Sequence, residues 1–403
     1  MPYLTARALA GLKAYTYKPC GYTLLDKLHT PAWEWMASCL PLWLAPNLIT
    51  LTGLTCVATA YSTAIIYAPC YVGEDGPLPR WLHALCALAV VLYVNLDCLD
   101  GKQARRTRSS SPLGQLFDHG CDALSLHALM ANVQVGFGQR CGPLAAAMQL
   151  VMMWPWLLAH WEEYHTGVMV YGNGLVGILE ANYAMAAVSL LSAVAGEQVW
   201  GTRLPLPAVS ALPPGLASQL TLRNLVFLIC GGGSAVLGSE QLYRMLLRRS
   251  SPSSLPSGPP PAAAAPPLAT AAAAVEAAAA DFSRGSPSAR HRDGRPGAGE
   301  QAAGPLAASS ASAAQAAAMA SKQAGLEGVE QLPPGERGHK ELGMAQRWRH
   351  LLLLTSLTLL GAIWQAVPHP GRWQCRLVSS SYGVTYALVA SQLIVAHMAP
   401  PAS

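Results

Sequence analysis

Four aspartates are concentrated between Asp97 and Asp122, in the most chemically distinctive part of this sequence. Asp97 and Asp100 are three residues apart, and Asp118 and Asp122 are four apart. On helices, both spacings place two side chains on one face. Two such helices joined as a hairpin bring four carboxylates together. Because like charges that close disfavour ionisation, the cluster is expected to require cations.

Divalent metal ions with oxygen ligands suit such a cluster, and we expect two ions, Mg²⁺ or Mn²⁺. Two metals can clamp the bridging oxygens of a diphosphate during displacement. The residues between the acid pairs fit a nucleotide diphosphate. Gly101 and Ala104 are small enough for close approach to the backbone, Arg105 offers bidentate donors to phosphate, and Gly114 leaves the start of the return helix clear. Solvated acids at ordinary helix ends are the disfavoured alternative.

The rest of the chain is composed like a membrane protein. Of 403 residues, 52% are hydrophobic and 12% are charged, against about 25% charged in soluble proteins. The net charge of +5 is too small to indicate nucleic-acid binding. A soluble enzyme, a secreted disulfide scaffold and a disordered protein are therefore excluded, and an all-α polytopic membrane fold is predicted.

About 20 apolar residues span a bilayer, and eight segments approach this length. The third and the fifth contain polar residues. The expected spans are Asn47–Ala68, Trp81–Leu99, Ala123–Phe137 with the preceding turn, Pro143–His160, Leu175–Val194, Leu222–Leu247, Trp348–Val367 and Tyr382–Met398.

Four regions follow from this pattern. Residues 1–46 form a cytosolic amphipathic segment without a signal peptide, and its first 18 residues are expected to lie on the membrane. Residues 47–249 form the catalytic transmembrane domain with the motif at 97–122. Residues 250–345 form a disordered Ala/Pro/Ser-rich linker, and residues 346–403 hold the last helices. The distribution of Lys and Arg over the short loops places Asp100 and both termini in the cytosol.

Three cysteines fall in loops on the opposite side of the membrane: Cys70, Cys141 and Cys375. A disulfide among them is one alternative. Because the cysteine density is low and no C-x-x-C pair occurs, unpaired thiols are the favoured prediction.

The motif resembles the signature of the CDP-alcohol phosphatidyltransferase family, D-x-x-D-G-x-x-A-R-x8-G-x3-D-x3-D. The residues around it, DGKQARRT followed by SSSPLG and LFDHGCD, are similar to those of eukaryotic choline/ethanolamine phosphotransferases. PLWLAPNLITLTG, HWEEYHTG and VAHM add to the resemblance, which covers most of the chain outside the linker. The signature positions are Asp97, Asp100, Gly101, Ala104, Arg105, Gly114, Asp118 and Asp122.

The resemblance implies an enzyme that joins CDP-choline or CDP-ethanolamine to diacylglycerol, and it leaves the choice of head group open. It further implies two Mg²⁺ on the four aspartates, Arg105 on the diphosphate and Asn47 on the nucleotide. Read alone, Asn47 is instead a helix N-cap. The implied setting is the endoplasmic reticulum or the Golgi, with a cytosolic active site and a homodimer. Relatives usually have about ten membrane helices and lack the long insertion.

Two residues compete for the role of base. The wider family suggests Asp122, but a carboxylate bound to metal is a weak base. His119 titrates near neutrality and suits the role better, although a His beside a metal site often only supports the ligands.

HWEEYHTG supplies further candidates. Glu162, Glu163, Tyr164 and His165 are expected to border the head-group pocket, where carboxylates and aromatic faces attract a quaternary ammonium. An ordinary polar helix end is the alternative. Glu180 lies in an apolar run, where an ionisable side chain needs a partner.

Three rival functions remain from the sequence. The first is a related transferase with another acceptor or head group. The second is a cation transporter, which would not explain why Gly101, Ala104 and Arg105 accompany the aspartates. The third is a catalytically idle scaffold.

Overall fold

The computed structural model describes residues 11, 12, 15, 17–74, 76–204, 220–247, 343–367, 371 and 373–398. All belong to one compact unit. These residues contain nine α-helices, one short 3-10 helix and two two-residue strands. The α-helices are α2 (Leu24–Cys39), α3 (Pro46–Tyr67), α4 (Arg80–Arg106), α5 (Pro112–Gly136), α6 (Pro143–Thr166), α7 (Ile178–Ala195), α9 (Leu222–Leu246), α12 (Met344–Ala366) and α13 (Gln374–Met398).

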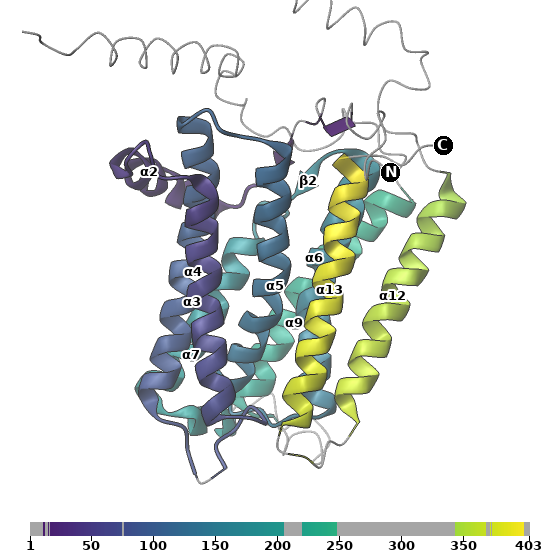
Figure 1. Ribbon diagram of the computed structural model, residues 1–403. Coiled ribbons are helices and arrows are strands. Elements are labelled where there is room, and N and C mark those ends of the chain that lie inside the picture. Colours follow the sequence, from purple (N-terminus) through teal and green to yellow (C-terminus); the bar gives the residue numbers. More distant parts are fainter. Residues whose placement is uncertain are drawn as a thin grey trace, which may run out of the picture. The chain divides into compact units, whose positions relative to one another are not determined.

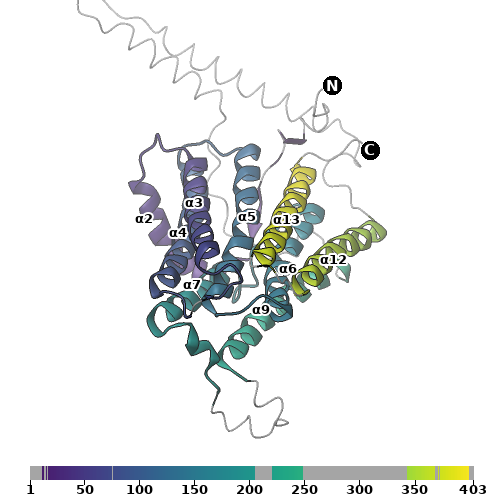
Figure 2. The same ribbon diagram turned by 60° about the horizontal axis from the view of Figure 1, so that its bottom comes forward.

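The remaining elements are η1 (Glu197–Gly201), β1 (Pro19–Cys20) and β2 (Met169–Val170). Eight long helices run up and down side by side, while α2 lies at the flank of the bundle, beside α4 and near one end (Figures 1 and 2). Every predicted span corresponds to one of these eight helices. Proline marks the start of three of these helices. Pro46, Pro112 and Pro143 each occupy the first helical position, where the backbone N–H would have no partner within the helix.

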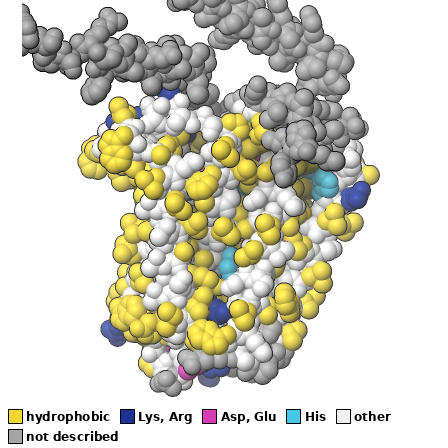
Figure 3. All heavy atoms as spheres, viewed as in Figure 1, with side chains coloured by type: hydrophobic (Ala, Val, Ile, Leu, Met, Phe, Trp, Pro, Cys, Tyr) yellow, Lys and Arg dark blue, Asp and Glu magenta, His cyan; other side chains and the backbone are white. Residues whose placement is uncertain are grey.

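The outer surface of the bundle suits a bilayer. By length and composition, α3, α4, α7, α9 and α13 can cross a membrane. Hydrophobic side chains cover much of the flank in the space-filling view (Figure 3). Exposed tryptophans stand near helix ends, for example Trp43 beside the start of α3, Trp81 at the start of α4 and Trp364 near the end of α12, as expected of aromatic residues at the membrane–water interfaces. The chain is an all-α polytopic membrane protein.

The end of the bundle away from the aspartate motif carries a disulfide. Cys141, in the loop between α5 and α6, is bonded to Cys375 at the start of α13. The prediction of unpaired thiols is therefore wrong for these two residues. The two cysteines are 234 residues apart in sequence, and only the packing of α13 against α5 and α6 brings them together.

Close packing of α13 against α5 depends on a glycine. A Cβ at Gly383 would lie 2.2–2.7 Å from three atoms of the His127 side chain, so any larger residue would force the helices apart. His127 in turn contacts the Gln149 amide on α6 at 2.9 Å. Helix α13 is thus an integral part of the helix bundle.

Two predicted regions fall largely outside the described residues: the membrane-surface segment 1–18 and the linker 250–345. Helix α12 begins at Met344, just inside the predicted linker boundary. The helix found in the N-terminal region, α2, starts at Leu24 with Thr23 and Asp26 forming a capping box.

Candidate active site

A tight turn between α4 and α5 builds the hairpin that carries the aspartates. Helix α4 ends in a Schellman motif, in which Arg108 has a φ of 56° and the Ser109 N–H donates to the Ala104 carbonyl at 2.9 Å. Helix α5 begins at once, with the Ser111 hydroxyl accepting from the Gly114 N–H at 3.0 Å. Both helices extend beyond the predicted spans, so all four aspartates lie on regular helix.

The two helix faces meet as expected. Ligand oxygens of Asp97, Asp100 and Asp118 all lie within 4.8 Å of one another. Asp122 lies beside this group, where its carboxyl interacts with that of Asp97. The Tyr93 hydroxyl donates to Asp122 Oδ1 at 2.6 Å, which orients this fourth carboxylate.

The donor set fits a hard divalent metal. Asp118 Oδ1 is buried with no hydrogen-bond partner, and an orphaned buried carboxylate oxygen is costly unless a cation or donor reaches it. Asp100 is held in place by a hydrogen bond from the Thr50 hydroxyl on α3. Three converging carboxylates offer the oxygen ligands that Mg²⁺ and Mn²⁺ prefer.

Two neighbouring arginines of the motif have different environments. Arg105 is exposed and lies close enough to Asp100 to interact electrostatically with it. Arg106 instead binds the C-terminal carbonyls of α2, donating to Ala37 O at 2.9 Å and Ser38 O at 3.1 Å. Arg105 is therefore exposed, as diphosphate binding requires. Arg106 instead stabilises a helix terminus.

Small residues line the same face of α4. Gly101 and Ala104 follow Asp97 at the fourth and seventh positions, which continue one helix face. A Cβ at Gly101 would meet only the Arg105 guanidinium, at 3.5 Å, so the surface above it is open.

Asn47, near the start of α3, lies close to Gly114 of the motif. The N-cap of α3 is Ala45, which makes no side-chain cap bond, so the N-cap interpretation of Asn47 is wrong. A Cβ at Gly114 would lie 3.7 Å from Asn47 Oδ1. The exposed Asn47 amide thus stands beside the start of α5 and is available to a ligand.

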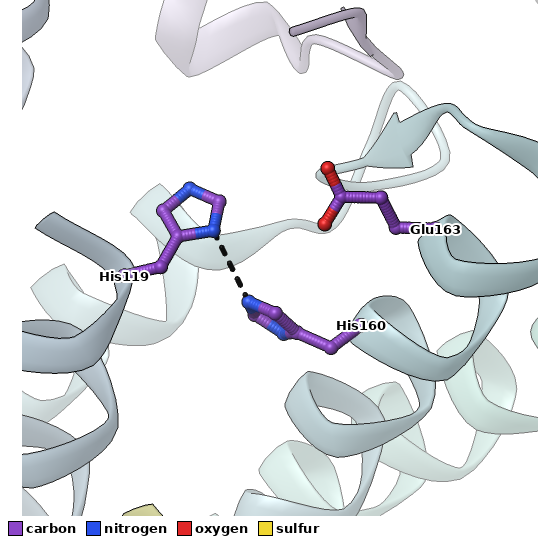
Figure 4. A group of neighbouring side chains, drawn as sticks. All are labelled: His119, His160 and Glu163. Atoms are coloured by element: carbon purple, nitrogen blue, oxygen red, sulfur yellow. Dashed lines mark hydrogen bonds between the residues drawn. The ribbon is translucent and has the colours of Figure 1, made fainter. Parts of the chain in front are cut away.

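A second buried cluster lies next to the aspartates. His119 Nδ1 is 3.3 Å from His160 Nε2 on α6, and Glu163 follows one turn later (Figure 4). One ligand atom from each of these three residues lies within 4.8 Å of the others. The sequence singled out His119 and Glu163, but nothing in it pointed to His160, which opens the HWEEYHTG stretch.

The other HWEEYHTG residues are spread over several environments. Glu162 is fully buried and forms a bidentate ion pair with Arg244 of α9, at 2.6 and 2.7 Å. The Tyr164 ring packs edge-on against His165 and His350. Only Glu163 faces the histidine cluster, so the structure does not bring the four predicted head-group residues together.

Glu180 lines a mostly apolar cavity. Helix α7 begins at Ile178, so Glu180 lies in its first turn, near one end of the predicted apolar span. The helix dipole favours a carboxylate there. The cavity measures about 330 Å³ and is lined mainly from α5, α6, α7 and α9, with Tyr93 of α4 and Val170 of β2. Asp122, Glu180, Glu240 and Arg244 are its charged groups, and most of the exposed lining surface is apolar, including Leu126, Met130, Val133, Met148, Met185 and Val226.

An N-terminal extended segment covers the histidine cluster, a feature that sequence reasoning missed. Strand β1 pairs in parallel with β2, which follows α6. The Tyr17 ring packs edge-on against His119 with centroids 5.5 Å apart, and its hydroxyl bonds that of Tyr171. Burial raises the pKa of both tyrosines well above the usual range, so both stay protonated.

The fold and site define a class of protein: a polytopic membrane protein with an aspartate cluster beside an apolar cavity. Residues 43–193 match the family model for CDP-alcohol phosphatidyltransferase. Among curated relatives, cholinephosphotransferase 1 of Gallus gallus is 34% identical over 247 residues, covering 59% of this chain and 71% of the relative. The chain belongs to the CDP-alcohol phosphatidyltransferase family.

Two further relatives show how far the similarity extends. Cholinephosphotransferase 1 of Homo sapiens is 37% identical over 206 residues, covering 50% of this chain and 49% of the relative. An uncharacterized CDP-alcohol phosphatidyltransferase class-I family protein of Dictyostelium discoideum is 37% identical over 204 residues, covering 49% of this chain and 47% of the relative. The chain thus spans about half the length of these two relatives.

Proposed function

We propose that this chain transfers phosphocholine or phosphoethanolamine from CDP-choline or CDP-ethanolamine to diacylglycerol, forming phosphatidylcholine or phosphatidylethanolamine and CMP. The observation that carries the proposal is the position of Asp122. It belongs to the aspartate cluster and also lines the apolar cavity. A polar nucleotide and an apolar acceptor can therefore meet at one carboxylate cluster.

Each substrate has a matching surface. Asn47, Gly101, Ala104 and Arg105 present an open, polar face for the nucleotide diphosphate, and Gly114 keeps the start of α5 clear for it. The cavity of about 330 Å³ is mostly apolar, as a site for acyl chains must be. We expect diacylglycerol to enter it sideways from the bilayer.

The reaction is a displacement at the β-phosphorus. The diacylglycerol hydroxyl attacks, the bond to the oxygen that leaves with CMP breaks, and His119 takes the hydroxyl proton. Asp97, Asp100, Asp118 and Asp122 would hold two Mg²⁺ or Mn²⁺, which supply positive charge to the diphosphate oxygens. Arg105 orients the diphosphate with paired donors.

The printed names of the animal relatives favour choline as the head group. Glu163 is the candidate carboxylate for the head group, because Glu162 is neutralised by Arg244 and Tyr164 packs against histidines. A related transferase with another acceptor or head group is the alternative.

The chain would lie in the membrane of the endoplasmic reticulum or of the Golgi. The aspartate end of the bundle would face the cytosol, since Lys102, Arg105 and Arg106 lie there. A homodimer is expected from the resemblance.

The decisive experiment is a turnover assay on membranes containing this chain, with diacylglycerol, Mg²⁺ and either radiolabelled CDP-choline or CDP-ethanolamine. We expect labelled phospholipid from at least one donor, and the comparison identifies the head group. Product from radiolabelled CDP-diacylglycerol and a water-soluble alcohol, with none from diacylglycerol, would refute the proposed acceptor. Metal flux through the protein without nucleotide would indicate a transporter.

The paired arginines allow a controlled prediction. Arg105→Ala should lower kcat/KM for the CDP-alcohol by about 10²-fold, because the diphosphate loses paired charged donors. Arg105→Lys should restore little, since an ammonium cannot reproduce the bidentate geometry. Turnover as a function of CDP-alcohol concentration measures both effects.

Arg106→Ala is the matched control. It removes the bonds to Ala37 and Ser38, so it should lower the Tm in detergent while the folded fraction keeps nearly normal kcat/KM. Equal loss of kcat/KM in both alanine variants would contradict the assignment of the diphosphate to Arg105.

A further inference from the structure

The apolar cavity beside the aspartates is elongated along the helices. Along α5 its lining begins at Asp122 and ends at Phe137, the C-cap residue of that helix. These positions are 15 residues apart, which corresponds to about 22 Å at a rise of 1.5 Å per residue. Helix α9 runs in the opposite direction and lines the cavity over a similar length, from Val226 to Arg244. The cavity is therefore a slot with Asp122 at one end and Phe137 at the other.

The size of this slot suits one acyl chain. The hydrocarbon core of a bilayer is about 30 Å thick, so the chains of one leaflet span about 15 Å. A slot of about 22 Å can therefore hold an extended chain of ordinary length. Its volume of about 330 Å³ lies at the small end of the range for drug-sized ligands, about 300–1,000 Å³. That volume is too small for both chains of a diacylglycerol.

An aromatic pair closes the end of the slot away from the aspartates. Phe137 packs edge-on against Trp200 of η1, with ring centroids 4.8 Å apart, and both side chains are buried. The Trp200 indole N–H donates to the Ser192 hydroxyl at 2.7 Å, and that hydroxyl donates to the Gly136 carbonyl oxygen at 2.6 Å. A Cβ at Gly136 would lie 3.3 Å from Val188 Cγ1, so α5 and α7 are in close contact there. The position of the Phe137 ring is therefore fixed.

We infer that this slot binds one acyl chain of the acceptor and that Phe137 sets the longest chain accepted. The inference rests on the proposed function, because the glycerol hydroxyl must reach the aspartates for transfer. With that hydroxyl beside Asp122, one chain of the same molecule lies along the slot toward Phe137, and the other stays in the bilayer. A chain longer than the slot contacts the aromatic pair and holds the hydroxyl short of the aspartates. Turnover therefore depends on chain length.

Two substitutions should shift the preferred chain length in opposite directions. Val133 lines the slot one turn before Phe137, so Val133→Trp should fill the far end. The ratio of kcat/KM for dioleoylglycerol to that for didecanoylglycerol should fall about tenfold or more, since a hydrophobic pocket discriminates about 10- to 200-fold for one methylene. Phe137→Ala should lengthen the slot and raise the ratio for dierucoylglycerol over dioleoylglycerol by about tenfold. Both ratios are measured within one preparation, so a lower folded fraction does not change them.

Val236→Trp is the matched control. Val236 lies on α9, is half exposed on its outer face and does not line the slot. The substitution adds the same ring at the surface, so both ratios should stay within about twofold of wild type. A Val133→Trp ratio that also stays within this range would overturn the inference. An equal shift in the Val133 and Val236 variants would overturn it as well.

Photolabelling tests the slot without turnover. The probe is a diacylglycerol with a diazirine at the end of one oleoyl-length chain, and mass spectrometry identifies the labelled residues. We expect label between Val133 and Phe137 or at Trp200, and loss of that label in Val133→Trp. Label found only elsewhere would refute the inference. Label at these residues, with no wild-type turnover at any chain length, would count against the proposed function and leave the chain-binding slot supported.

Discussion

Replacing Asp118 by Asn is expected to lower kcat/KM by about 10³-fold or more while leaving the protein folded and inserted. Asp118 Oδ1 is buried without a hydrogen-bond partner, so the carboxylate makes no bond there that stabilises the fold. At that oxygen, the buried negative charge is compensated only when a cation or a donor binds. An amide of the same shape removes that charge, and loss of a metal-binding group costs several kcal/mol of transition-state stabilisation.

The measurement is turnover at a series of Mg²⁺ concentrations, with Tm recorded in the same detergent. Asp26→Asn is the matched control, because Asp26 accepts the Thr23 N–H at 2.8 Å in the capping box of α2. That variant should lose about 1 kcal/mol of helix stability and keep its turnover. Near-normal activity of Asp118→Asn would contradict the metal assignment. Asp100→Asn should be similarly inactive but less stable, because Asp100 is also bonded to Thr50.

His119→Ala is expected to reduce kcat by about 10²- to 10⁴-fold, the range for loss of a general base. The side chain is buried beside the aspartate cluster and is oriented by His160. The binding surfaces for nucleotide and acyl chains do not depend on it, so KM for both substrates should change little. Full Michaelis curves for CDP-alcohol and diacylglycerol check this separation.

Asp122→Asn tests the alternative base in the same assay. Asp122 contributes to the metal cluster and accepts the Tyr93 hydroxyl, so its loss should abolish turnover and weaken the response to Mg²⁺. A reduction of less than tenfold in His119→Ala would return the role of base to Asp122 or to a metal-activated hydroxyl.

The clustering of the aspartates was predictable because all four lie within one short segment. Asp97, Asp100, Asp118 and Asp122 are spaced for helix faces, and the turn between the two helices is only five residues, 107–111. Helix periodicity and a short connection leave little freedom in such a hairpin. The convergence of three carboxylates within 4.8 Å agrees with that expectation.

Other expectations failed because the relevant partner is distant in sequence. Glu162 was expected at the head-group pocket, but Arg244, 82 residues later, neutralises it. Cys141 was expected to be a thiol, but the packing of α13 places Cys375 beside it. Neither pairing follows from local composition, because any of several loops or helices could have supplied the partner.

The sequence by itself determined the all-α membrane fold, the positions of the eight long helices among the described residues and the aspartate hairpin, since hydropathy and helix periodicity are local properties of the chain. Only the tertiary structure decided which side chains surround that hairpin. His160 reaches His119 across 41 residues, Tyr17 covers the same ring from the N-terminal segment, and four helices enclose the apolar cavity beside Asp122. Such contacts depend on how helices pack against one another, and side-chain shape and burial over the whole bundle determine that packing.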